Sequence, residues 1–185
     1  MQTAVKNEFV SVADYLAAEE AGQTRHEYLG GFVYGMAGET LIHNQISGNL
    51  YLALRQLLKS TPCRAYISDI RVNFHLHNDE YYYYPDIMVT RDKRDKHPRF
   101  VKHPRLIIEV LSESTERVDK REKFFAYTSI ESLQEYVLVS QTGREATVFR
   151  RDKNWKADKV SGAKPALHLE SLDIKVALSA IYDGV

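Results

Sequence analysis

Apolar residues recur at helical spacing in two stretches near the start of the chain. Residues 8–20 carry apolar side chains on one face, with Ser11 as a candidate N-cap and Gly22 as a stop signal. Residues 41–58 repeat apolar positions at three- and four-residue steps, which predicts a second helix that Pro62 prevents from continuing. The apolar positions of that second helix are Ile42, Ile46, Leu50, Leu54 and Leu57.

Alternating and continuous apolar runs predict strands elsewhere. Residues 25–36 form two short alternating pieces around Gly30 and Gly31, a hairpin signal because glycine supplies the positive φ that tight turns require. Glu27 then lies on the first strand of this hairpin. Further strands are predicted at 65–76, 82–89 and 106–111, and a closing meander at 136–139, 145–150 and 155–160.

Residues 116–130 have a few apolar positions among many charges and predict an amphipathic helix with an acidic first turn. The elements together indicate the α/β class, with a mixed central β-sheet flanked by helices. At 185 residues with 44% hydrophobic side chains, the chain is long enough for one well-buried core and short for two. We therefore expect residues 1–185 to form a single domain.

The composition restricts the function classes. Cys63 is the only cysteine, which rules out an intrachain disulfide and a cysteine-based zinc site and fits a reducing compartment. The first ten residues lack the features of a signal peptide, and no apolar run approaches the ~20 residues that a membrane helix needs. We expect a soluble, cytoplasmic protein.

Basic residues concentrate in one segment. The whole chain has 25 Lys and Arg against 25 Asp and Glu, so it carries no global positive field. Residues 91–105 hold seven Lys or Arg against two Asp. The segment joins the predicted strands 82–89 and 106–111, which hold the two candidate carboxylates described next, so it is expected to lie near them and to contact nucleic-acid phosphates, the alternative being a solvated linker. The side chains expected to bind are Arg91, Lys93, Arg94 and Lys96.

Two carboxylates interrupt predicted apolar strands. Asp86 and Glu109 would each be costly to bury unless they were paired or bound to a metal. Hard oxygen ligands suit Mg²⁺ or Mn²⁺, and such an ion can offset phosphate charge and activate water. Lys123, on the helix after the Glu109 strand, could stabilise the transition state. It shares a helix face with Asp119 and Tyr127.

At these positions the sequence resembles a family of unknown function, associated with restriction endonucleases, within the PD-(D/E)xK nuclease superfamily. The resemblance covers most of the chain. Its motifs are HEYLGG from His26, His43 at the start of the second helix, Pro85-Asp86-Ile87, Glu109-Val110-Leu111-Ser112, Asp119-x-x-x-Lys123-x-x-x-Tyr127, and LQEYVLV from Leu133.

The resemblance implies a restriction-endonuclease-like core. It also implies that Asp86, Glu109 and Glu27 are metal ligands and that Lys123 is the catalytic lysine. Leu111 stands where the wider superfamily has its lysine, and in this branch the lysine is placed on the helix. Gly30 stands where the family usually has an acidic residue.

Each candidate also has a structural interpretation. Asp86 could cap a turn, Glu109 could be satisfied by a buried arginine, and Lys123 could form an exposed ion pair with Asp119. His43 could bind metal or phosphate, although a histidine in the first turn of a helix more often makes a local hydrogen bond. Tyr81 to Tyr84 are expected to pack on both faces of a sheet rather than to stack on bases.

The combined expectation is a metal-dependent endonuclease that hydrolyses DNA phosphodiester bonds. A homodimer is plausible because cutting both strands of a duplex usually needs two sites. The alternatives are a nucleic-acid-binding module that kept the fold without turnover, and a hydrolase of small phosphate esters.

Overall fold

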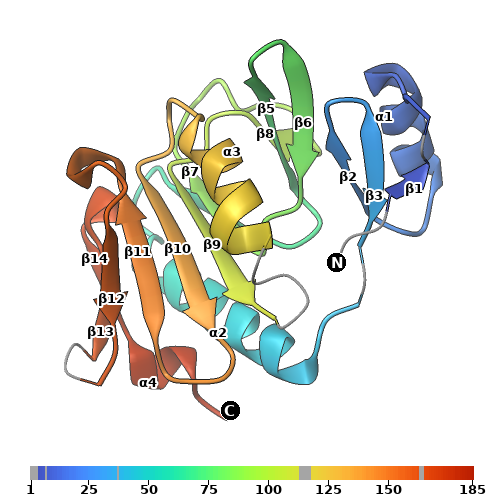
Figure 1. The fold of residues 1–185 in the computed structure, drawn as a ribbon. Helices are drawn as coiled ribbons and strands as arrows, with labels where there is room; N and C mark the ends of the chain where they lie inside the picture. The colour runs from blue at the N-terminus through green and yellow to red at the C-terminus, as the bar shows by residue number, and fades with distance from the viewer. Residues whose placement is uncertain (1–3, 7, 37, 113–117, 163–164) are drawn as a thin grey trace.

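We describe the protein from a computed structural model, in which the described residues form two six-stranded β-sheets and four α-helices, together with a smaller sheet (Figure 1). The structure describes residues 4–6, 8–36, 38–112, 118–162 and 165–185. Within these ranges, no helix has both the length and the apolar character needed to cross a membrane.

The central sheet is mixed, as predicted, with strand order β12-β11-β10-β9-β7-β4. Strands β9 and β10 pair in parallel, and the other neighbours are antiparallel. Covered on both faces, β9 and β10 are almost continuously apolar. The strands are β4 (Arg64–Ile67), β7 (Ile87–Thr90), β9 (Leu106–Leu111), β10 (Glu135–Ser140), β11 (Ala146–Arg150) and β12 (Ala157–Val160).

The side chains of β9 alternate between two hydrophobic cores. Leu106, Ile108 and Val110 pack in the core that contains α2 (Leu41–Leu57). Ile107 points into the other core, which contains α3 (Phe124–Thr128) and part of the second sheet. Because side chains alternate along a strand, Glu109 shares the α3 face with Ile107.

The second sheet has the order β1-β3-β2-β6-β5-β8 and lies beside the α3 face of the central sheet (Figure 1). Its hairpin turns at Gly30 and Gly31, which both have positive φ, so the predicted hairpin is confirmed. Tyr15 of α1 (Val12–Ala21) packs on Tyr28 and Tyr82 of this sheet. The strands are β1 (Ala4–Lys6), β2 (His26–Leu29), β3 (Phe32–Gly35), β5 (Arg71–Leu76), β6 (Asp79–Tyr83) and β8 (Phe100–Val101).

Two strand predictions were wrong in the same way, because each joined two strands that belong to different sheets. The segment 65–76 divides into β4 and β5 near Ser68, which has a φ of 50°. The segment 82–89 divides into β6 and β7 around Pro85, which has no N–H to donate to a ladder. Asp86 therefore lies in a crossover between sheets and not inside a strand.

The first two predicted helices are confirmed, and so is the predicted cap at Ser11. The Ser11 side chain accepts a hydrogen bond from the backbone of Asp14, and Gly22 ends α1. Thr40 caps α2 by accepting from the His43 backbone. The third helix comprises a π-helical segment, Val118–Lys123, and then α3; the start of the prediction, at Glu116, lies outside the described residues.

The predicted meander corresponds to β10, β11 and β12. The elements after it were not predicted: β13 (Ala166–Leu169), β14 (Ile174–Ala177) and α4 (Leu178–Ile181). They are short, but Leu167, Val176 and Ile181 complete the core around α2.

Candidate active site

Glu109 is the best-connected carboxylate of the candidate site. It lies on β9 with 2% of its surface exposed. Its Oε1 atom accepts hydrogen bonds from Lys123 Nζ at 3.2 Å and from the Tyr127 hydroxyl at 2.9 Å. Its Oε2 atom accepts from the Asp86 backbone N–H at 3.2 Å. The partners of the Glu109 carboxylate thus include a lysine and a tyrosine from one helical segment.

Asp86 and the Glu109 strand hold each other in place. The Val110 backbone N–H donates to Oδ2 of Asp86 at 2.7 Å, while the Asp86 N–H donates to Glu109. The Asp86 side chain is 21% exposed, so its carboxylate reaches the surface while that of Glu109 lies behind it. The two carboxylates are thus adjacent, as the sequence predicted, although β6 and β7 diverge at this point.

Lys123 is buried between two carboxylates from different sheets. Its Nζ atom lies 3.2 Å from Oε1 of Glu109 and 3.3 Å from Oε1 of Glu27. It also sits 5.7 Å from the centre of the Tyr83 ring. The interpretation of Lys123 as part of an exposed helix ion pair is wrong because the side chain is 8% exposed. The side chain of Asp119 lies outside the described residues.

Glu27 is fully buried on β2, where its Oε1 atom accepts a hydrogen bond from the Tyr84 backbone at 3.3 Å and forms an ion pair with Lys123. Among the described residues, no group of three or more His, Cys, Asp or Glu side chains is arranged to hold a metal ion. The role of Glu27 as a third metal ligand stays a prediction. In this structure its carboxylate contacts the ammonium group of Lys123.

Two carboxylates nevertheless suit the ion that was expected. Magnesium keeps several of its waters and is commonly bound through one or two carboxylates together with phosphate oxygens of the substrate. Asp86 and Glu109 form such a pair, with Asp86 partly open to solvent. The donor set thus fits Mg²⁺ or Mn²⁺ in chemistry.

Tyr127 is a proton donor in this arrangement at neutral pH. Burial raises the pKa of its hydroxyl well above the ordinary value, and the negative charge of Glu109 raises it further, against the opposing effect of Lys123. Burial likewise raises the pKa of Tyr83. The two rings pack edge to face with centres 5.5 Å apart. Tyr82 points to the opposite side of the sheet, into the cluster around Tyr15, so the packing interpretation of the tyrosine run is confirmed.

His43 belongs to the site. Its Nε2 atom lies 3.0 Å from Oδ2 of Asp86, and its backbone is fixed by the Thr40 cap. Together with Asp86 and Ser47, it lines a cavity of about 150 Å³. The buried Ser47 hydroxyl, one helical turn after His43, makes no hydrogen bond among the described residues. Sequence reasoning missed Ser47, although its four-residue spacing from His43 places both on one helix face.

The basic segment lies elsewhere. Strands β7 and β9 are antiparallel with Ile87 opposite Ile108 and Val89 opposite Leu106, so the segment joins the ends farthest from Asp86. Four strand residues, roughly 13 Å, separate Thr90 from Asp86. The inference that this segment must lie near the carboxylates is wrong. Whether Arg91, Lys93, Arg94 and Lys96 bind phosphates stays a prediction.

Comparison with known proteins points to one family. Residues 12–180 match the model of Uma2, described as "Putative restriction endonuclease". The uncharacterized proteins slr1290 and sll1609 of Synechocystis sp. (strain ATCC 27184 / PCC 6803 / Kazusa) are 35% and 28% identical to this chain over 179 residues. The first alignment covers 95% of this chain and 93% of slr1290, and the second covers 94% and 100%.

A solved structure supports the same assignment at the level of fold. The crystal structure of "a putative nuclease belonging to DUF820" from Anabaena variabilis ATCC 29413 superimposes with a TM-score of 0.74 at 15% identity. The match covers 94% of this chain and 97% of the other. It confirms the expected restriction-endonuclease-like α/β fold. Since the family model spans almost all of the sequence, the chain belongs to the Uma2 family of "Putative restriction endonuclease" proteins.

Proposed function

We propose that this protein is a metal-dependent endonuclease that hydrolyses DNA phosphodiester bonds with Asp86, Glu109 and Lys123. The observation that carries the proposal is the reciprocal link between Asp86 and Glu109 beside a buried lysine. Burying two carboxylates and a lysine close together costs desolvation free energy, and such arrangements are concentrated at functional sites. Membership of a family described as "Putative restriction endonuclease" supports the same reaction class.

Asp86 and Glu109 would hold Mg²⁺ or Mn²⁺. When bound, the ion would offset charge on the scissile phosphate and lower the pKa of a water molecule. Lys123 would stabilise the negative charge that develops on the phosphate during attack. Glu27 is then a positioning residue, because its carboxylate contacts the same lysine ammonium group that contacts Glu109.

His43 acts on Asp86 in this proposal. The imidazole contacts Oδ2, the same oxygen that accepts the Val110 N–H. Two contacts on one carboxylate oxygen fix the orientation of the group, which is the role that outer hydrogen bonds play around metal ligands. The cavity beside His43 gives room for water close to the carboxylate.

Conversion of supercoiled plasmid to nicked and linear forms in manganese tests the proposal. Asp86→Asn and Glu109→Gln should each remove most of the cleavage with little change in volume. The matched control is Asp152→Asn, an exposed aspartate in a short 3-10 turn. Wild-type-like cleavage by either site variant would refute the assignment. Metal-independent DNA binding without cleavage by the wild type would instead identify a binding module.

A further inference from the structure

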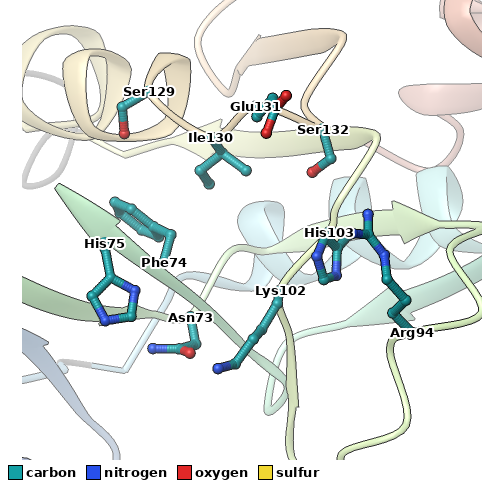
Figure 2. A pocket seen from close by; sticks show the side chains of 10 residues that line it. All are labelled: Asn73, Phe74, His75, Arg94, Lys102, His103, Ser129, Ile130, Glu131 and Ser132. Atoms are coloured by element: carbon teal, nitrogen blue, oxygen red, sulfur yellow. The ribbon is translucent and has the colours of Figure 1, made fainter.

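An open groove of about 630 Å³ lies at the end of α3 that is remote from Lys123 (Figure 2). One wall comes from β5, one from Lys102 and His103 after β8, and one from residues 129–132 after α3. Phe74 borders both this groove and the candidate active site, because its ring centre lies 6.2 Å from that of Tyr127.

Basic side chains reach the groove from several segments. His75, Lys102, His103 and Arg94 line it, with Glu131 as the acidic lining residue. Arg94 is held by Asp92, whose Oδ2 lies 2.6 Å from its Nη2 atom, and the Nδ1 atom of His103 lies 3.1 Å from the buried carboxylate of Asp95. Neither aspartate is among the residues that line the groove, so each one orients its basic partner from outside the groove lining.

Asn73 supplies a second, independent feature. The side chain is 1% exposed and lines the groove. Its Nδ2 atom donates to Oε1 of Glu80 at 2.8 Å and to the Tyr81 carbonyl at 3.2 Å. Its Oδ1 atom accepts no hydrogen bond in the described structure. A buried acceptor without a donor is rare in folded proteins, so this oxygen indicates a ligand or water that donates to it.

The unpartnered acceptor lies next to a cation. Strands β5 and β8 are parallel with Val72 beside Val101, so Asn73 and Lys102 are neighbours on one side of the sheet. In Figure 2 the side chains of Asn73, His75 and Lys102 extend to the same side of the groove. A ligand here would meet positive charge and a hydrogen-bond acceptor together.

We propose that this groove binds one nucleotide unit, with its phosphate at Lys102, His75 and Arg94 and a sugar hydroxyl or base N–H at Oδ1 of Asn73. The choice of a nucleotide over another anion rests on the proposed nuclease function. The phosphate belongs either to a nucleic-acid strand or to a free nucleotide.

Fluorescence anisotropy of a labelled single-stranded DNA of roughly 12 nucleotides tests the proposal on the full chain without divalent cation. Lys102→Gln should weaken binding several-fold and reduce the slope of log K against log salt by about 0.7. Adding His75→Gln should weaken it further. The matched control is Lys175→Gln, an exposed lysine on β14. All three positions are exposed, so the variants should fold.

Competitors identify the source of the phosphate. Displacement of the probe by 5′-adenosine monophosphate assigns the groove to free nucleotides, and displacement by unlabelled strand alone assigns it to the backbone. Equal affinities and salt slopes for Lys102→Gln and Lys175→Gln would overturn the proposal, as would equal competition by a glutamate-rich peptide of the same charge. Binding through Lys102 without cleavage in manganese would refute the nuclease proposal and leave the groove in place.

Discussion

Oε1 of Glu27 lies 3.3 Å from Nζ of Lys123, and both side chains are buried. Because Glu109 contacts the same ammonium group, Lys123→Met would leave two carboxylates beside an apolar side chain. Removing one partner of a buried ion pair typically costs ~3–5 kcal/mol. We expect a loss of that size in the free energy of unfolding, measured by urea denaturation. Lys156→Met, an exposed control, should change it by less than ~0.5 kcal/mol. An equally small loss for Lys123→Met would contradict the pairing.

Tyr127→Phe should weaken the site while keeping its packing. The variant loses the hydroxyl that donates to Glu109 Oε1 but retains the ring between Tyr83 and Tyr136. A hydrogen bond to a charged group contributes roughly 1.5–3 kcal/mol, so the melting temperature should fall. The manganese concentration for half-maximal cleavage should rise, because Glu109 is less firmly oriented. Tyr51→Phe serves as the control; unchanged manganese dependence would limit Tyr127 to a structural role.

Manganese should stabilise the folded wild-type protein by mass action. At 100 times the dissociation constant, a ligand that binds only the folded state adds ~2.7 kcal/mol. Differential scanning fluorimetry should show this as a higher melting temperature for wild type and Asp152→Asn. Asp86→Asn should show a much smaller rise because a ligand is lost. Without metal, Asp86→Asn should melt near wild type, since an amide oxygen can still accept the Val110 N–H. Equal manganese shifts for all three proteins would remove Asp86 from the metal site.

Alkaline pH should destabilise the protein through its buried tyrosines. Burial raises the pKa of Tyr182 from 10.0 to about 12, and the Glu145 backbone N–H, which donates to the hydroxyl at 3.2 Å, opposes the shift. The folded state holds this proton more tightly than the unfolded state, so the contribution is complete below pH 10 and is lost between pH 10 and about 12. It amounts to roughly 1–2 kcal/mol once partial solvent screening is allowed for. Thermal melts from pH 8 upward should show the decline, which should be shallower in Tyr182→Phe.

The basic segment should affect DNA binding and leave turnover intact. Arg91, Lys93 and Lys96 line a hollow of about 540 Å³ at the end of β7 remote from Asp86. Changing all three to Gln should lower the slope of log K against log salt on duplex DNA by about 0.9 for each phosphate that the segment neutralises in the wild type. Turnover at saturating DNA should stay at the wild-type level. An unchanged slope would mean that the segment only links strands.

Local sequence patterns predicted helices and turns better than they predicted which strands pair with one another. The cap at Ser11 and the turn at Gly30 depend on neighbouring residues alone, and the structure retains the helix and the hairpin that they begin or join. The splitting of 65–76 and 82–89 depends on which sheet each half joins, which apolar periodicity does not encode. The apolar patterns of 65–76 and 82–89 therefore did not reveal that the chain passes from one sheet to the other within each segment.

The candidate site was predictable in its residues and less so in its contacts. Asp86 and Glu109 stood out as charges in apolar surroundings, and they are adjacent. The role of Glu27 could not be read from sequence because it depends on how the hairpin meets α3. The basic segment was misplaced for a different reason: it follows the C-terminal end of β7 and precedes β9, whereas Asp86 precedes β7 and Glu109 lies near the far end of β9.

Glu27 comes from one sheet, Glu109 from the other, and Lys123 bridges them. If the β2–β3 hairpin separates from α3, the central sheet stays intact but Lys123 loses its contact with Glu27. Local opening of that kind precedes global unfolding in many proteins. If the protein cleaves DNA as proposed, loss of this contact would disrupt the site before the central sheet unfolds, and the site would form only after the second sheet has docked on α3.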